Sequence, residues 1–246
     1  MKRHTQILAC SKTDPGLQRL RNKDVCQADT VCGFFLVADG MGGRAAGNVA
    51  SELFREAVME VFSPGEELGL AEGEAKVRDA FSLANRKIFA HVDDNPHHSG
   101  MGCTAELLIF CQNRYLIGHV GDSRTYLFRG DRIQQLTRDH SFVQDQVDKG
   151  IITPQQARKS RFRNILLRAI GVDPFLEVDI VCDLHYPGDI FLLCTDGLHT
   201  MLGDDEIASI LAVQEPLAVK ANMLINRAND AGGNDNIAVS LAKIME

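Results

Sequence analysis

Between residues 103 and 136, four short apolar or alternating segments follow one another with only tight turns between them, and this spacing limits the possible fold more than any other sequence feature. Parallel neighbours would need crossovers of about a dozen residues or more. The spacing therefore predicts an antiparallel meander. Its expected strands are 103–111, 115–120, 124–128 and 133–136.

Helical patterns flank this strand-rich centre. Apolar residues recur at spacings of three and four from Ala46 to Val61, which predicts a helix that starts near Arg44 and follows a strand at 34–38. Such a mixture is typical of an α+β protein in which helices cover antiparallel sheets. The other expected elements are helices at about 71–91, 204–212 and 217–228, and strands at 176–182, 189–194 and 236–244.

Composition excludes several classes of protein. The chain has 246 residues, with 26 Lys and Arg against 33 Asp and Glu, a net charge of −7. This balance disfavours sequence-independent binding of nucleic acid and docking on anionic lipid. No apolar run approaches the ~20 residues of a membrane span. Seven cysteines without a CxxC pair indicate reduced thiols in a cytoplasmic protein. No linker or repeat divides residues 1–246, so a single domain is expected.

Four aspartates stand at the edges of apolar strands: Asp39, Asp122, Asp196 and Asp235. Each has a glycine beside it or two residues away, so the backbone can approach a ligand closely. One Asp-Gly pair alone indicates a turn. Four carboxylates that converge at strand ends would repel one another unless cations neutralise them. Oxygen ligands without Cys or His favour Mg²⁺ or Mn²⁺ over Zn²⁺.

A competing motif overlaps the first aspartate. Residues 40–45, Gly-Met-Gly-Gly-Arg-Ala, match the G-x-G-x-x-A dinucleotide fingerprint between a strand and a helix. The acidic residue about 20 positions later, Glu60, falls inside the expected helix and not at the end of a second parallel strand. Asp39 would also direct a carboxylate at the pyrophosphate. These features count against a nucleotide site.

Seven motifs, read in order along the chain, resemble those of the metal-dependent Ser/Thr protein phosphatases of type 2C (the PPM family) in their compact bacterial form. They cover about residues 16–239 and are Gly16–Asp24 (G-x-x-R-x-x-N-x-D), Val37–Gly43 (V-A-D-G-M-G-G), Met101–Thr104, His119–Arg124 (H-V-G-D-S-R), Leu136–Ser141, Leu193–Leu198 and Gly233–Ile237. The resemblance implies a four-layer α-β-β-α sandwich of two antiparallel sheets flanked by helices. It also implies a flap at about 140–163.

The resemblance further implies a set of metal ligands. Asp39 would bridge two Mn²⁺ or Mg²⁺ ions, and the Gly40 carbonyl would bind one of them. Asp196 and Asp235 would complete the other. Asp122, together with Asp196, would hold a weaker third ion. Two such ions lower the pKa of a shared water and hold it in line with phosphorus.

The same resemblance assigns the remaining catalytic positions. Arg19 would bind the substrate phosphate, Asp24 would orient metal-bound water, and Asn236 would support the site. The implied activity is direct hydrolysis of phosphoserine and phosphothreonine in proteins, opposing a bacterial Ser/Thr kinase. Proteins that antagonise anti-sigma factors are one possible substrate class, which the sequence does not distinguish from others.

Three positions depart from the family pattern. Lys23 stands where the family usually has Glu or Gln, and its ammonium cannot accept a hydrogen bond from metal-bound water. Met41 replaces the His that many eukaryotic members have as a general acid. Ser160 in the flap replaces a His of many bacterial members. Nearby basic residues are interpreted either as a solvated surface or as a docking patch; they are Arg158, Lys159, Arg161 and Arg163.

An alternative hypothesis is an inactive or weakly active relative, a phosphoprotein-binding regulatory module of the same fold. Such proteins typically lose metal ligands, whereas all four aspartates are present here. Lys23 is the residue that favours this alternative.

Overall fold

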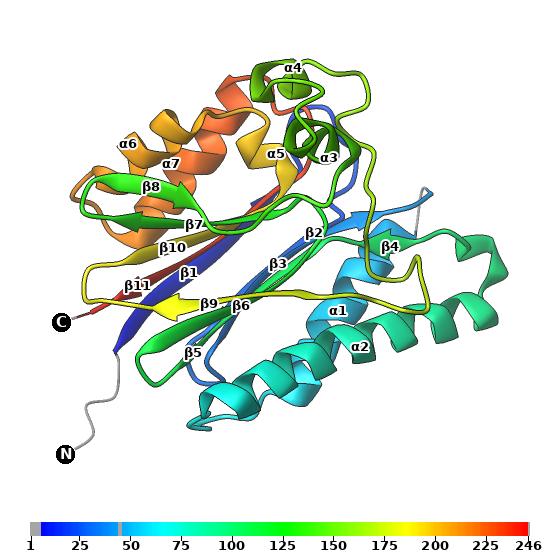
Figure 1. The fold of residues 1–246 in the computed structure, drawn as a ribbon, viewed down its shortest axis with the longest axis horizontal. Helices are drawn as coiled ribbons and strands as arrows, with labels where there is room; N and C mark the ends of the chain where they lie inside the picture. The colour runs from blue at the N-terminus through cyan, green and yellow to red at the C-terminus, as the bar shows by residue number, and fades with distance from the viewer. Residues whose placement is uncertain (1–5, 44–45, 246) are drawn as a thin grey trace.

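The computed structural model describes residues 6–43 and 46–245. Two sheets form the centre, and their strands pair in antiparallel fashion across the described residues (Figure 1). The β1 sheet has the strand order β1 (Ile7–Asp14), β11 (Ile237–Ile244), β10 (Ile190–Cys194), β7 (Arg124–Arg129) and β8 (Arg132–Gln135). The β2 sheet has the order β2 (Asp24–Asp29), β3 (Phe34–Met41), β5 (Ala105–Cys111), β6 (Arg114–Val120) and β9 (Asp179–Leu184), with β4 (Gly102–Cys103) paired to β3.

Helices cover the outer face of each sheet (Figure 1). The β2 sheet is covered by α1 (Gly47–Val61) and α2 (Leu70–Asp94), which a 3₁₀ turn at Pro96–His98 follows. The β1 sheet is covered by α5 (Asp196–His199), α6 (Asp204–Ala212) and α7 (Leu217–Asp230), with α3 (Phe142–Asp148) and α4 (Pro154–Arg158) beside α5. The expected four-layer α-β-β-α sandwich is confirmed. Across the described residues, no helix has the length and apolar character to cross a membrane.

The layers enclose three apolar cores. Along β3, Phe34 and Leu36 pack toward the helical layer with Phe54, whereas Phe35 and Val37 pack between the two sheets. Successive side chains of a strand point to opposite faces, so a strand buried on both faces carries a continuous apolar run. This burial explains why 34–38 lacks the alternation of a surface strand.

The chain changes sheets at Gly121–Ser123, where β6 of the β2 sheet leads into β7 of the β1 sheet. The four expected strands are antiparallel, but the prediction of one continuous meander is wrong, because β5–β6 and β7–β8 are hairpins in different sheets. A short turn cannot reveal whether the next strand stays in its sheet. Gly121 has a φ of +112°, which allows the change of direction.

Other differences concern strand positions. β1 and β2 were not expected, and the strand expected at 176–182 is displaced to Asp179–Leu184. Every residue of β1 pairs with β11, from Ile7 opposite Ile244 to Asp14 opposite Ile237, so tertiary pairing stabilises a segment with weak local signals. Arg44 and Ala45, at the expected start of the first helix and in the dinucleotide-like motif, lie outside the described residues.

Candidate functional site

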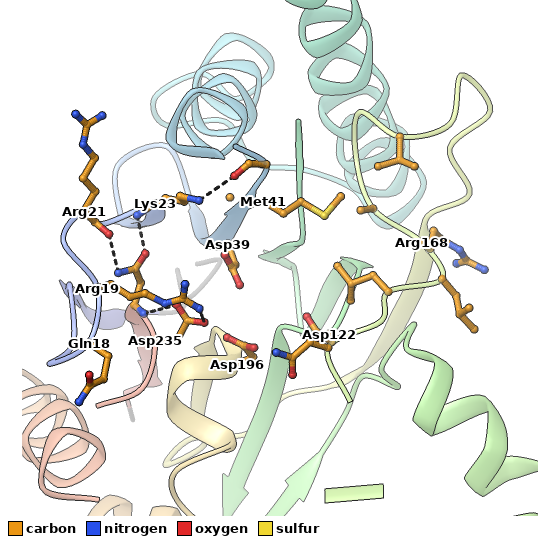
Figure 2. A pocket seen from close by; sticks show the side chains of 18 of the residues that line it. Gln18, Arg19, Arg21, Lys23, Asp39, Met41, Asp122, Arg168, Asp196 and Asp235 are labelled. Atoms are coloured by element: carbon orange, nitrogen blue, oxygen red, sulfur yellow. Dashed lines mark hydrogen bonds and ion pairs between the residues drawn. The ribbon is translucent and has the colours of Figure 1, made fainter. Parts of the chain in front are cut away.

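The four aspartates line one pocket of about 1000 Å³ at an end of the sandwich (Figure 2). Asp39 lies near the end of β3, and Asp122 lies at the crossing between β6 and β7. Asp196 follows β10 as the first residue of α5, and Asp235 lies two residues before β11. Because β10 and β11 are antiparallel, the end of one meets the start of the other. The predicted convergence is thus present in the structure.

Burial and mutual repulsion destabilise the charged forms of these carboxylates. Burial, followed by the charge of Asp235, raises the pKa of Asp39 to about 6. Burial, followed by the charge of Asp39, raises the pKa of Asp122 to about 7 and that of Asp196 well above its usual range. Divalent cations among these groups would reverse that effect, because they stabilise the carboxylate form.

The donor set fits hard divalent cations. Oδ1 of Asp196 is buried without a hydrogen-bond partner, as expected of a ligand oxygen that lacks its cation. Within the described residues, however, no three His, Cys, Asp or Glu side chains are arranged to hold a metal ion as they stand. Asp235 is paired instead with Arg19, and Asp39 contacts Asp24. These carboxylates would have to turn toward a shared ion in order to bind it.

Arg19 reaches into the pocket from a loop that is held in place by the segment just before β11. The backbone N–H groups of Leu17 and Gln18 donate to the Gly233 carbonyl at 2.8 and 3.2 Å. Nη2 of Arg19 lies 2.7 Å from Oδ2 of Asp235, and this pairing raises the pKa of the guanidinium. The Arg19 side chain is still 52% exposed. A permanently charged, accessible guanidinium is suited to binding phosphate oxygens.

Asp24 lies behind the pocket, not in its lining. It begins β2 opposite Asp39, and its Oδ2 accepts a hydrogen bond from the Thr195 hydroxyl at 2.7 Å. Burial, followed by the charge of Asp39, raises the pKa of Asp24 well above its usual range, and its Oδ1 is buried without a hydrogen-bond partner. The sequence had not singled out Thr195, although it lies beside Asp196 in a recognised motif. Thr195 and Asp24 together orient Asp39.

Lys23 joins several parts of the site. Its Nζ donates to the Gly42 carbonyl at 3.0 Å (Figure 2), and its backbone N–H donates to Oδ1 of Asn236 at 2.9 Å. Its carbonyl accepts hydrogen bonds from the Gly40 N–H at 3.2 Å and the Ser51 hydroxyl at 2.6 Å. Lys23 therefore fixes the loop after Asp39 while bringing a positive charge into the aspartate pocket.

Two further residues shape the backbone. Nδ2 of Asn236 donates to the carbonyls of Pro15 and Arg21 at 2.9 and 3.0 Å, which anchors the loop that carries Arg19. A Cβ at Gly40 would lie 2.0 Å from the Gly47 carbonyl oxygen, so only glycine fits there. This close packing brings the start of α1 against the loop that carries the Gly40 carbonyl.

Comparison with known proteins identifies the family. Residues 16–146 match the family model described as Protein phosphatase 2C. The chain is 36% identical over 236 residues to the serine/threonine phosphatase stp of Listeria innocua. The matched region covers 94% of each of the two chains. The chain belongs to the protein phosphatase 2C family. The resemblance and the enzyme class inferred from the motifs are confirmed.

Similar members of the protein phosphatase 2C family include enzymes of known structure. The chain is 38% identical over its whole length to the serine/threonine protein phosphatase PstP of Mycobacterium tuberculosis, of which it spans 47%. A structure of the PstP catalytic domain in complex with two manganese ions has a TM-score of 0.87 at 35% identity, covering 98% of this chain and 99% of that one. Stp1 of Staphylococcus aureus has a TM-score of 0.92 at 29% identity, covering 100% and 98%.

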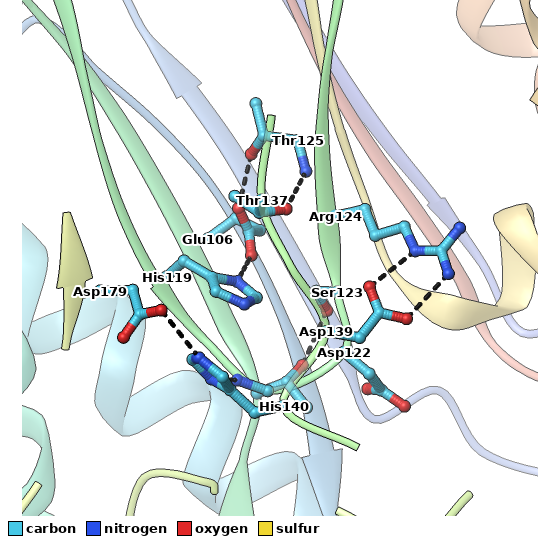
Figure 3. Close-up of polar contacts among 12 residues, drawn as sticks. Glu106, His119, Asp122, Ser123, Arg124, Thr125, Thr137, Asp139, His140 and Asp179 are labelled. Carbon is cyan, nitrogen blue, oxygen red and sulfur yellow. Dashed lines mark hydrogen bonds and ion pairs between the residues drawn. The ribbon is translucent and has the colours of Figure 1, made fainter. Parts of the chain in front are cut away.

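A second polar cluster in this phosphatase lies beside the pocket (Figure 3). The carboxylate of Glu106 is fully buried, is paired with His119, and accepts a hydrogen bond from the Thr125 hydroxyl at 2.5 Å. Arg124 holds Asp139 through two hydrogen bonds of 2.8 Å. We call these five residues the paired cluster. The sequence analysis had not assigned them a role.

Contacts from this part of the phosphatase position the Asp122 backbone. His199 contacts the Asp122 carbonyl at 2.9 Å, and the Gly121 N–H donates to Nδ1 of His140 at 3.1 Å. The hydroxyls of Ser123 and Thr104 are 2.7 Å apart. The backbone on both sides of Asp122 is thereby fixed before any ion binds.

The expected flap contains α3 and α4. A second pocket of about 570 Å³ separates it from α5 and the start of α6, and both Arg158 and Arg163 line this pocket. Arg161 lies over the ring of Phe162, 4.6 Å from its centroid. Ser160 accepts a hydrogen bond from the Phe162 N–H at 3.2 Å and does not line the aspartate pocket.

Proposed function

We propose that this phosphatase hydrolyses phosphoserine and phosphothreonine in proteins with the help of Mn²⁺ or Mg²⁺. The observation that carries the proposal is the convergence of four carboxylates on one pocket that also contains Arg19, with raised pKa values for Asp39, Asp122 and Asp196. Asp39, the Gly40 carbonyl, Asp196 and Asp235 would hold two core ions. Asp122 and Asp196 would hold a weaker third. When bound, such ions supply an activated water and neutralise phosphoryl charge.

The chain's own groups position the substrate. Arg19 turns from Asp235 toward the phosphoryl oxygens, which frees the Asp235 carboxylate for a cation. Asp24, held by Thr195, orients Asp39 and the water near it. Asn236 anchors the loop that carries Arg19 through its two hydrogen bonds to that loop, which keeps Arg19 beside the pocket. These movements are side-chain rotations on a fixed backbone.

The leaving oxygen receives its proton from water. Met41 has no acidic proton, and no histidine occurs among the described residues that line the pocket. The pocket is open, so solvent reaches the ester oxygen. The positive charges of Lys23 and Arg19 stabilise the negative charge electrostatically.

The wider setting is part of the same proposal. We assign residues 1–246 to one catalytic domain, because the described sheets share one core between them. Its partners would be phosphorylated proteins in the cytoplasm, and its functional counterpart a Ser/Thr kinase. The names of the relatives, which are serine/threonine phosphatases, support this setting.

A phosphoprotein-binding module of the same fold is the second candidate. Two observations favour it: the cation of Lys23 in the aspartate pocket and the Arg19–Asp235 pair that occupies a carboxylate. The presence of all four aspartates supports the enzyme.

A phosphothreonine peptide assay separates the two. We expect phosphate release that requires Mn²⁺ or Mg²⁺ and that EDTA abolishes. Arg19→Ala should lower kcat/KM about 100-fold or more, since it removes the phosphate contact. Release that persists in EDTA would refute the metal-dependent mechanism, and binding without release would establish the module.

A further inference from the structure

The chain segment that passes the side of the pocket opposite Arg19 is unusually rich in exposed apolar side chains, two of which, Leu167 and Val172, line the pocket. Of 15 large hydrophobic side chains that are exposed in the described chain, five fall within residues 162–175. We call this stretch the apolar segment. Its exposed members are Phe162 (40%), Ile165 (46%), Leu167 (58%), Val172 (57%) and Phe175 (91%). Exposed apolar groups gathered in this way mark binding surfaces more often than scattered ones.

Backbone hydrogen bonds hold the apolar segment in place, so its apolar side chains are exposed on an ordered backbone. The Leu167 N–H donates to the His140 carbonyl at 2.8 Å, and the Ile165 carbonyl accepts from the Phe142 N–H at 2.8 Å. Ile170 and Cys103 exchange two backbone hydrogen bonds of 2.9 and 3.0 Å. A surface held in place before its ligand arrives loses little entropy on binding.

The apolar segment is continuous with the catalytic pocket. Leu167 and Val172 line the pocket together with the four aspartates. Arg168, held by Asp179 at 2.6 Å, lies on the opposite side of the aspartates from Arg19 and Arg21 (Figure 2). The volume of about 1000 Å³ is at the upper end for sites that take a drug-sized ligand. It therefore has room for residues beside the phosphorylated one.

We propose that the apolar segment binds an apolar side chain of the phosphoprotein, within about three residues of the phosphoserine or phosphothreonine. This inference rests on the proposed phosphatase function. An extended peptide advances about 3.3 Å per residue, so neighbours of a phosphoresidue at Arg19 pass over the side of the pocket opposite Arg19. Leu20, on the Arg19 side and fully exposed, gives the opposite rim the same apolar character.

Charge favours a phosphopeptide over a second copy of this chain. Arg163 lies within the apolar segment and Arg161 directly precedes it, whereas Arg168 is already paired with Asp179 and Glu177. Two copies of this face would bring like charges together, whereas a phosphorylated peptide carries the complementary charge.

The test uses two phosphothreonine peptides of equal length and charge, one with Leu and one with Asn two residues to either side of the phosphothreonine. With Mn²⁺ present, we expect kcat/KM to favour the Leu peptide by about 5- to 20-fold, at the low end of what an apolar subsite contributes. In the double variant Leu167→Ser/Val172→Ser this ratio should fall to about 1–2. Because both peptides see the same enzyme, partial unfolding of the variant cancels from the ratio.

Val31→Ser is the matched control, because Val31 is 66% exposed but does not line the pocket. It should keep the wild-type ratio. Equal turnover of both peptides by the wild-type enzyme would overturn this inference and leave the phosphatase function intact. If neither peptide is hydrolysed, the proposed function fails. The ratio of the two peptides' dissociation constants then shows whether the apolar segment binds the Leu side chains. A dimer that the double variant abolishes, without peptide preference, would overturn the inference in favour of self-association.

Discussion

The aspartate pocket and the paired cluster lie a few residues apart in the chain, yet their charges are organised in opposite ways. Burial alone would raise the pKa of Asp139, but two hydrogen bonds from Arg124 and its charge lower it below the usual value. For Asp122, two residues before Arg124, burial and the charges of Asp39 and Asp139 raise the pKa to about 7. Figure 3 shows Arg124 hydrogen-bonded to Asp139, and Figure 2 shows the four pocket aspartates gathered around one cavity.

The difference separates groups that stabilise the fold from groups that serve the reaction. Each charge of the Arg124–Asp139 pair has its partner within the chain, so the pair is complete without a ligand. The pocket carboxylates lack enough partners, and Oδ1 of Asp196 has none. Unpaired, strongly perturbed groups around a cavity are typical of functional sites. Substitutions in the two regions should therefore affect different measurements.

The largest effect is expected from Asp39→Asn. Phosphopeptide turnover should fall on the order of 1000-fold, because a ligand shared by two ions is weakened. The free energy of unfolding of the metal-free protein should not decrease, because a repelled carboxylate is removed. Steady-state kinetics and denaturant unfolding in EDTA measure the two quantities. Asp183→Asn, an exposed carboxylate on β9, is the control, and a stability loss as large as the activity loss would erase the contrast.

Arg124→Ala should mainly lower the stability of the fold. It leaves the Asp139 carboxylate buried without its cation, so we expect the free energy of unfolding to fall by about 3–5 kcal/mol. Arg78→Ala, which breaks an exposed pair with Glu74 on α2, should cost well under ~1 kcal/mol. Denaturant titrations compare them directly. Equal losses in the two variants would mean that the paired cluster contributes no more than a surface ion pair.

The free energy of unfolding of the metal-free protein should change with pH in opposite directions for the two regions. A carboxyl whose folded-state pKa is raised stabilises the fold at low pH, and this stabilisation is lost as pH rises through that pKa. For Asp122 the loss begins near pH 4, in the ordinary aspartate range, and is complete by about pH 8. Asp122→Asn should therefore gain about 1 kcal/mol of stability relative to wild type from pH 6 to pH 8 in EDTA.

The Asp139 pKa is lowered, so the corresponding contribution is lost only as pH falls below the ordinary aspartate range. Unfolding free energies measured in EDTA at pH 6, 7 and 8 check the Asp122 prediction. An advantage of Asp122→Asn that stays constant across this range would contradict it.

The smallest effect is expected from Lys23→Gln, which restores the residue type common in the family. Removing a cation from the pocket should tighten Mn²⁺ binding about 3- to 10-fold, since like charges repel. The Gln side chain can still donate to the Gly42 carbonyl, so the loop keeps its anchor. Calorimetric Mn²⁺ titration measures the change, and weaker binding would show that Lys23 acts mainly as a scaffold.

Much of this site could be predicted from the sequence. Asp39 and Asp196 each follow an apolar strand directly, so their position at a sheet end required only local signals. Lys23, Thr195 and Glu106 required the fold, because their partners lie 19 to 171 residues away or on a neighbouring strand. The change of sheets at Gly121 was missed for the same reason. Turn chemistry is local, but the choice of sheet depends on how Phe35 and Phe191 pack between the layers.

The central claim is that the pocket aspartates, and not the paired cluster, bind divalent cations. Calorimetric titration of the metal-free protein with Mn²⁺ tests it most directly. The wild-type chain should bind Mn²⁺ at two or more sites, Asp39→Asn should lose this binding, and Glu106→Gln should retain it as long as it folds. Failure of the folded wild-type protein to bind Mn²⁺, or equal binding by Asp39→Asn, would contradict the account.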